Sequence, residues 1–136
     1  PASTDCEHMR DLTPLLADIL SREPGLRLAL LFGSFAQGTA APDSDVDVAV
    51  LFNRPLDAEQ KMRLIEKLAD RTERAVDLVD LHHAGEPLLG QVLKGRRLLG
   101  ADSDYTALTL RHLYDQEDFM PYISRMLAER RRAWIG

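Results

Sequence analysis

The sequence predicts an α/β fold, in which a small mixed β-sheet is flanked by helices and followed by two C-terminal helices. Mainly apolar runs at 28–32, 46–51 and 75–81 have the length of strands and are bounded by turn-forming or polar residues. Segments with apolar residues three and four positions apart lie between these runs, and beyond Gly100 the pattern is helical throughout. This alternation is typical of a sheet whose faces are covered by helices.

The first element is expected to be a helix. Thr13 and Pro14 suit the N-cap and the first helical position, and Pro24 with Gly25 ends the segment. The apolar residues with helical spacing are Leu15, Leu16, Ile19 and Leu20. We expect this face to pack against the sheet.

The strand at 28–32 is expected to leave the sheet at Gly33. A glycine there permits a sharp turn and lets a ligand approach the backbone closely. Ser34 adds a hydroxyl and an amide at the start of a helical turn over 34–37, a position that favours anions. A Gly-Ser pair after a strand is by itself usually only a turn. Gly33 and Ser34 therefore become a candidate phosphate site only together with the motif that follows.

Two aspartates open the next strand. Small and turn-forming residues fill the loop 38–43, after which Asp45 and Asp47 alternate with Val46 and Val48. Side chains repeat every two residues in a strand, so both carboxylates are expected on one face. Like charges so close disfavour each other's ionisation unless a cation lies between them, and hard oxygen ligands suit Mg²⁺ or Mn²⁺. A solvated strand face can also carry two aspartates, but the preceding Gly-Ser turn favours a phosphate and metal site.

A second helix and a third strand follow. Asp57 and Gln60 have the spacing of a capping box. The apolar stripe expected to face the sheet is Ala58, Met62, Ile65, Leu68 and Ala69. In the strand, Asp77 and Asp80 are expected on opposite sides of the sheet, so at most one of them can join the aspartate pair. The alternative for Asp80 is a capping role at the end of the strand.

Three further segments are expected. Pro87 opens a short helix over 88–93 that ends at Gly95, and 96–99 forms a short strand. A longer helix follows, from a cap at Asp102 or Ser103 to about residue 118.

The last helix is expected after a break near Pro121. Its apolar face consists of Tyr122, Ile123, Met126 and Leu127, and arginines charge the remainder. This pattern indicates either ordinary packing or the docking of a partner through the basic end or Trp134.

Composition predicts one domain over 1–136, with an α/β core at 1–100 and a helical extension at 101–136. A chain of 136 residues with 45% hydrophobic content can bury a single core. The net charge of −5 argues against strong nonspecific binding of nucleic acid. The single cysteine, Cys6, cannot form an internal disulfide, and no apolar run approaches the roughly 20 residues of a membrane span. With no visible signal peptide, we expect a cytoplasmic protein without membrane contact.

The two site motifs together resemble a known signature. The matching runs are Gly33-Ser34-Phe35-Ala36-Gln37-Gly38 and Ser44-Asp45-Val46-Asp47-Val48. They resemble the signature of the DNA polymerase beta-type nucleotidyltransferase superfamily. The short chain further resembles the minimal nucleotidyltransferases, small antitoxins that are paired with HEPN-domain toxins. The resemblance implies a nucleotidyltransferase fold and a third carboxylate on a later strand, for which the position favours Asp77.

The resemblance also implies an activity. ATP would be bound with its β- and γ-phosphates on Gly33 and Ser34. Two Mg²⁺ ions, or Mn²⁺, would be held by Asp45, Asp47 and Asp77. The implied reaction transfers AMP to a hydroxyl, tyrosine being the expected one, of a cognate HEPN ribonuclease toxin. This modification would neutralise the toxin within a hetero-oligomer of the two chains.

Two alternatives remain at this point. A nucleotidyltransferase with a small-molecule acceptor would use the same residues, although such enzymes usually carry a larger substrate-binding second domain. A noncatalytic antitoxin would instead mask its partner sterically, and the aspartates would be a remnant. Replacement of Asp45 and Asp47 by Asn distinguishes catalysis from masking.

Overall fold

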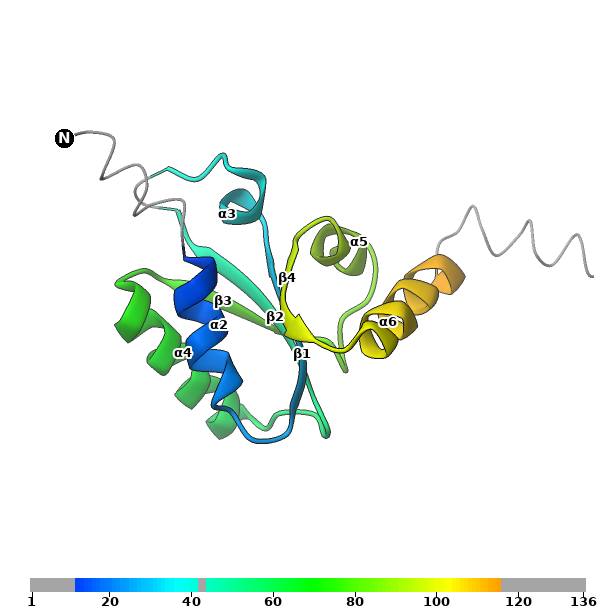
Figure 1. Ribbon diagram of the computed structural model, residues 1–136, viewed down its shortest axis with the longest axis horizontal. Helices are drawn as coiled ribbons and strands as arrows, with labels where there is room; N and C mark the ends of the chain where they lie inside the picture. Colours follow the sequence, from blue (N-terminus) through cyan, green and yellow to red (C-terminus); the bar gives the residue numbers. More distant parts are fainter. Residues whose placement is uncertain (1–11, 42–43, 116–136) are drawn as a thin grey trace, which may run out of the picture.

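The computed structural model describes residues 12–41 and 44–115. Along the chain the elements are α2 (Thr13–Ser21), β1 (Leu26–Phe32), α3 (Ser34–Gln37), β2 (Val46–Phe52), α4 (Ala58–Thr72), β3 (Val76–Asp80), α5 (Leu88–Leu93), β4 (Arg96–Gly100) and α6 (Asp102–Asp115). The strands form one mixed sheet, which confirms the predicted α/β class (Figure 1). None of the helices in the described part could span a membrane. The predicted last helix, with Trp134, and Cys6 lie outside the described residues.

The sheet has the strand order β3-β2-β1-β4. β1 pairs antiparallel with both β2 and β4, whereas β2 and β3 run parallel. A parallel pair needs a crossover connection, and α4 supplies it. Phe32 at the end of β1 lies opposite Asp47 near the start of β2. The turn after β1 and the starts of β2 and β3 therefore meet at one end of the sheet.

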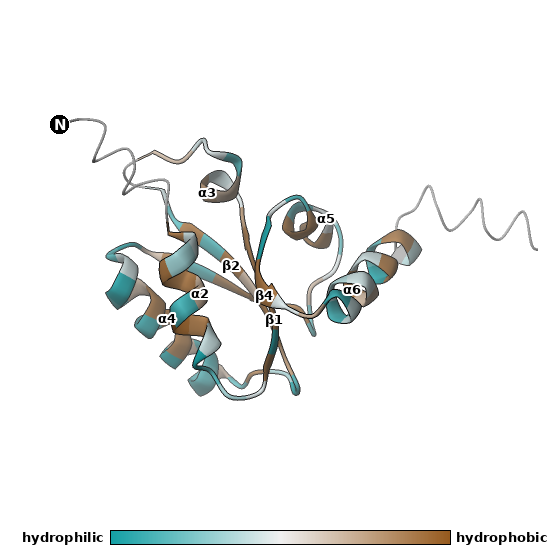
Figure 2. Ribbon diagram, in the orientation of Figure 1, coloured by the Kyte–Doolittle hydropathy of each residue, from teal (hydrophilic) through white to brown (hydrophobic). Residues whose placement is uncertain are grey.

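Different helices cover the two faces of the sheet (Figure 1). On one face, Leu31 and Val48 belong to a core that includes residues of α2 and α4. On the other face, Leu30 and Ala49 belong to a core shared with α5 and α6. In Figure 2 the strands at the centre of the sheet are mostly brown, and teal alternates with brown along α4. Because side chains alternate along a strand, Asp47 is on the same face as Ala49, toward α5.

Helix α2 begins one residue before the predicted position. Leu12 occupies the N-cap position without a side-chain cap, so Thr13 and Pro14 are the first helical residues. Proline is tolerated there because the first N–H groups of a helix have no intrahelical partner. The Thr13 hydroxyl instead accepts a hydrogen bond from Arg96 Nη1 over 3.1 Å. The prediction that Thr13 caps the helix was therefore wrong, because its side chain is used in a tertiary contact.

Helix α4 has the predicted capping box and part of the predicted apolar stripe. Asp57 Oδ1 accepts from the Gln60 N–H over 2.7 Å, and Gln60 Oε1 accepts from the Asp57 N–H over 3.1 Å. Leu68 is buried and Ile65 packs against the core, as predicted, whereas Ala58 is exposed. Met62, expected to face the sheet, is 56% exposed. The buried residues are Leu64, Leu68 and Thr72. Positions 62 and 64 are separated by about 200° around a helix, so one apolar face cannot include both.

The last described elements follow the predicted order. Pro87 precedes α5 at the N-cap position, and β4 includes the whole predicted strand. Helix α6 begins at Asp102, and the Ala101 C=O accepts its first bond, from the Tyr105 N–H over 3.1 Å. Neither Asp102 nor Ser103 is therefore the cap, and the predicted end near residue 118 lies outside the described part.

Candidate active site

Two of the candidate carboxylates stand side by side near the starts of β2 and β3. Asp47 and Asp77 are direct partners in the parallel register. Just before them, the Val46 N–H donates to the Ala75 C=O over 2.9 Å and fixes that register. Neighbouring strands are about 4.8 Å apart, and paired residues share a face of the sheet. Asp47 is partly buried and Asp77 is exposed, so the pair opens to solvent.

Asp80 lies on the other face of β3 and bonds to backbone groups. It is 8% exposed. Its Oδ2 accepts from the Leu56 N–H over 2.9 Å, and its Oδ1 accepts from the His82 N–H over 3.0 Å. The alternation that separates Asp77 from Asp80 is confirmed, as is the capping role of Asp80. His82 and His83 lie in the turn that follows β3.

Gly33 brings the end of β1 against Asp47. Its φ of +74° and ψ of −153° lie in a region that is essentially restricted to glycine. A Cβ at this position would lie 2.2 Å from Asp47 Oδ2. The missing side chain therefore makes room for the carboxylate. The sharp turn is as predicted, and the group that approaches the glycine in this structure is the Asp47 side chain.

Ser34 begins α3 immediately after this turn. The helix is a single turn, held by the Gln37 N–H bonded to the Gly33 C=O over 3.1 Å. It ends at Gly38, which has a left-handed conformation with φ +75°. The first N–H groups of a helix lack intrahelical acceptors. The Ser34 amide and hydroxyl thus directly follow Gly33, the residue that lies against Asp47, at the end of the sheet where the carboxylates lie.

Asp45 is exposed and directly precedes β2. Ahead of it, the Ala41 N–H donates to Ser44 Oγ over 2.8 Å. The Ser44 N–H donates back to the Ala41 C=O over 3.0 Å. This reciprocal pair joins Ala41 to Ser44 just ahead of the two aspartates. The negative charge of the exposed Asp45 acts on Asp47.

The carboxylates repel one another. Burial raises the pKa of Asp47, and the negative charges of Asp77 and then Asp45 raise it further. A divalent cation between oxygen donors of like charge would remove this penalty. In the positions they have in this structure, no three His, Cys, Asp or Glu side chains of the described residues are arranged so that they could hold a metal ion. The donor set, two exposed carboxylates beside a partly buried one, nevertheless suits a hard cation such as Mg²⁺ in its chemistry.

A cation–π contact supports the helical turn beside the carboxylates. The Arg74 guanidinium lies 5.0 Å from the centroid of the Phe35 ring. Phe35 belongs to α3 and is buried, whereas Arg74 lies in the segment between α4 and β3. The contact therefore joins α3 to the segment that leads to Asp77. Nothing in the local sequence predicts it, because the two residues come together only through the crossover.

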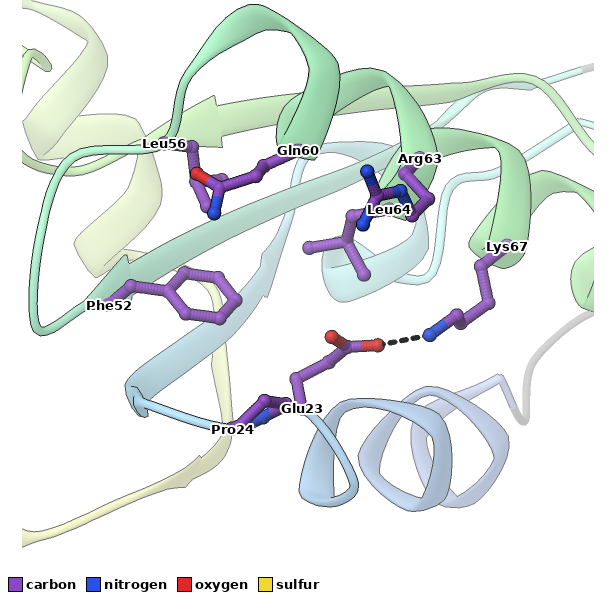
Figure 3. Close-up of a pocket in the computed structure, with 8 residues that line it drawn as sticks. All are labelled: Glu23, Pro24, Phe52, Leu56, Gln60, Arg63, Leu64 and Lys67. Atoms are coloured by element: carbon purple, nitrogen blue, oxygen red, sulfur yellow. Dashed lines mark hydrogen bonds and ion pairs between the residues drawn. The ribbon is translucent and has the colours of Figure 1, made fainter.

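A separate hollow lies at the other end of the sheet (Figure 3). Its volume is about 180 Å³, and it lies between the end of β2 and α4. Glu23 and Lys67 form an ion pair of 2.6 Å along one side of it (Figure 3). Phe52, which lines this hollow, is at the opposite end of β2 from Asp47. The hollow is therefore separate from the carboxylates.

Comparisons with known proteins agree with this geometry. The family model described as polymerase beta, nucleotidyltransferase matches residues 15–104. The protein adenylyltransferase MntA of Shewanella oneidensis is 44% identical over 82 residues, which are 60% of this chain and 59% of that protein. The match thus spans less than two thirds of that relative.

Two solved structures are similar over most of the chain. One is a toxin-antitoxin crystal structure with AMP-PNP, at 31% identity and a TM-score of 0.65, covering 90% of this chain and 93% of that chain. The other is a tri-AMPylated Shewanella oneidensis HEPN toxin in complex with MNT antitoxin, at 28% identity and a TM-score of 0.60. It covers 90% of this chain and 95% of that one. The family match covers more than half of the residues, so the chain belongs to the polymerase beta-type nucleotidyltransferase family, within which it is similar to the MNT-type antitoxins.

Proposed function

We propose that this chain is a metal-dependent protein adenylyltransferase. It transfers AMP from ATP to a hydroxyl, expected to be a tyrosine, of a cognate HEPN-domain toxin and so neutralises that toxin. The observation that carries the proposal is the close approach of Gly33 to Asp47, with Asp77 paired to Asp47 on the next strand. It puts a turn suited to phosphate beside a set of carboxylates suited to a metal ion.

The similar proteins support both substrates. The relative at 44% identity is named a protein adenylyltransferase. One of the similar structures contains AMP-PNP, and the other contains an AMPylated HEPN toxin. A nucleoside triphosphate and a protein acceptor are therefore the substrates that we assign to this chain, in a hetero-oligomer with its partner.

Asp45, Asp47 and Asp77 would hold Mg²⁺, or Mn²⁺ in its place. Such a cation supplies neutralising charge for the phosphates and lowers the pKa of an attacking hydroxyl. Two ions suit a set of three carboxylates in this chemistry. Burial is the main cause of the raised pKa of Asp47, and the charges of Asp77 and Asp45, which a bound cation would offset, raise it further.

The residues of the chain then act in sequence. Backbone N–H groups after Gly33 and the Ser34 hydroxyl bind the β- and γ-phosphates. Asp77 orients the acceptor hydroxyl and accepts its proton. The acceptor oxygen bonds to the α-phosphorus while the bond from that phosphorus to the bridging oxygen breaks, and pyrophosphate leaves with the electron pair. The products are an adenylylated hydroxyl and pyrophosphate.

The test is AMP transfer by the purified full chain. It is incubated with Mg²⁺ and labelled ATP, with and without the HEPN-domain protein encoded beside it, and both proteins are weighed by intact-mass spectrometry. We expect the partner to gain mass in AMP steps, and Asp45→Asn to abolish the gain. Asp70→Asn, which removes an exposed carboxylate from α4, is the matched control and should transfer normally.

Two outcomes would contradict the proposal. If the partner is bound and inhibited by the wild-type chain without any mass gain, the chain masks its partner sterically. If ATP is converted but neither protein gains mass, the acceptor is a small molecule.

A further inference from the structure

Next to Asp77, the β3 edge of the sheet has backbone groups that are unpaired among the described residues. The Ala75 C=O and the Leu81 N–H both bond to β2 over 2.9 Å. In a parallel ladder the alternate residues point their backbone groups the other way. The N–H and C=O groups of Val76 and Leu78 therefore point away from β2, and no described residue bonds to them. This edge has the open hydrogen-bonding pattern that another extended chain can join.

The open stretch is short and ends near the end of β3. There the His83 N–H donates to the Asp80 C=O over 3.0 Å, and Asp80 itself bonds to the backbone through both oxygens. The unpaired stretch is therefore limited to the part of β3 that flanks Asp77.

A groove of about 390 Å³ runs along this edge. Leu56 and Lys61 line it from the side of α4, and Ala84 and Leu88 line it from the side of α5. The strand from Asp77 to Asp80 lies between them. Because residues from both faces of the sheet line the groove, it runs along the edge of β3. Leu88, the first residue of α5, is 37% exposed and offers an apolar contact.

The groove and the turn at Gly33, which is proposed to bind the phosphates, lie on different sides of the carboxylates. Asp77 lines the groove and is paired with Asp47. Gly33 lies against Asp47 from β1, on the other side of β2. A nucleotide bound at the Gly33 turn would thus leave the groove open, and a chain in the groove would reach the carboxylates at Asp77.

We infer that the edge groove, defined by β3, Leu56, Lys61 and Leu88, binds an extended segment of the acceptor protein beside β3 and so brings the acceptor hydroxyl to Asp77. This inference rests on the proposed function. Unpaired N–H and C=O groups are satisfied best by another main chain, which a small-molecule acceptor lacks. Main-chain bonds to Val76 and Leu78 supply affinity, and contacts with Leu88 and Lys61 select the side chains of the segment.

The first experiment changes two residues that line the groove. Leu88→Asp and Lys61→Glu alter its lining, and both acidic replacements suit the first turn of a helix. We expect each to raise the KM for the HEPN-domain protein about tenfold, as the loss of a central interface contact does. The affinity for ATP should not change. Arg63→Glu makes the same charge change on α4 outside the groove and should leave the KM unchanged.

The second experiment measures whether the backbone N–H groups of β3 are protected in the complex. Amide hydrogen exchange is followed by mass spectrometry on the full chain, alone and with the HEPN-domain protein. We expect exchange at Val76 and Leu78 to slow at least tenfold in the complex. The opposite edge strand, β4, should exchange as in the free chain.

The results distinguish the groove from the chemistry. Normal AMP transfer with unchanged KM values for both groove variants, and no protection of β3, would overturn the proposed docking in the groove and leave the proposed adenylyltransferase activity intact. Protection of β3 without any AMP transfer would support the groove and overturn the adenylyltransferase.

Discussion

Replacement of Gly33 by alanine should disable the site without changing its charge. The backbone at Gly33, with φ +74° and ψ −153°, is costly for any residue that has a Cβ. The new methyl group would lie 2.2 Å from Asp47 Oδ2, whereas ordinary contacts begin at 3.4 Å. The methyl group and the carboxylate must therefore separate by about 1 Å.

The structure sets the size of both effects. Backbone strain of this kind costs about 1–3 kcal/mol, so the free energy of unfolding should fall by that amount. A displacement of about 1 Å in a catalytic group can cost about 100-fold in rate. We therefore expect Gly33→Ala to remain folded and to transfer AMP about 100 times more slowly than wild type.

The assay combines urea denaturation with the rate of AMP transfer to the HEPN-domain partner. Gly38→Ala is the matched control, because Gly38 also has positive φ but a Cβ there would meet nothing within 4 Å. Its left-handed conformation costs about 1–2 kcal/mol for alanine, so stability should fall while the transfer rate stays close to that of wild type. Equal loss of transfer in both variants would refute the reasoning, since strain alone would then explain the result.

Three further predictions concern single side chains. Ser34→Ala should weaken ATP binding about fivefold, as the loss of one neutral hydrogen bond of about 1 kcal/mol does, and unchanged affinity in a titration with AMP-PNP would argue against the phosphate role. Asp77→Asn should lower the rate of AMP transfer about 100-fold or more with normal stability. Asp80→Asn should instead lower the free energy of unfolding by about 1–3 kcal/mol, because it leaves a backbone N–H without its acceptor. The reverse ranking in melting and transfer assays would mean that the roles of the two residues are exchanged. In buffer with a chelator at pH 7, Asp47→Asn should melt at a higher temperature than wild type, because the raised pKa of Asp47 disfavours its charged form in the folded chain. The stability associated with Asp47 is present below its ordinary pKa of 3.8 and is lost as the pH rises through the raised value. The difference in melting temperature between Asp47→Asn and wild type should therefore vanish in acid. A variant that melts at a lower temperature than wild type at pH 7 would contradict the assigned cause.

Short-range patterns predicted most of the helices and strands and some of their local contacts. The apolar run before Gly33 is a buried strand, the turn over 34–37 is helical, and Asp57 with Gln60 forms the capping box. These features depend on neighbouring residues, whose spacing is visible in the sequence. The opposite facing of Asp77 and Asp80 follows from strand alternation in the same way.

Features that depend on tertiary packing could not be predicted. The Thr13 hydroxyl, expected to cap a helix, instead accepts a hydrogen bond from Arg96, and the buried face of α4 includes Leu64 in place of Met62. Both depend on which surface the rest of the chain presents. The pairing of Asp47 with Asp77 needs the strand order and register of β2 and β3. The edge groove likewise depends on the strand order and on the helices beside β3, so no local sequence pattern indicates it.

The most direct test of the central claim is the intact mass of the HEPN-domain partner after equal incubations with three forms of the chain. The wild type, Asp45→Asn and Asp47→Asn are each given ATP and Mg²⁺, and their folding is checked by melting. We predict AMP added to the partner by the wild type alone, with loss of neutralisation in both variants. Equal AMP addition by all three forms, or neutralisation by all three without any addition, would contradict a catalytic role for these aspartates.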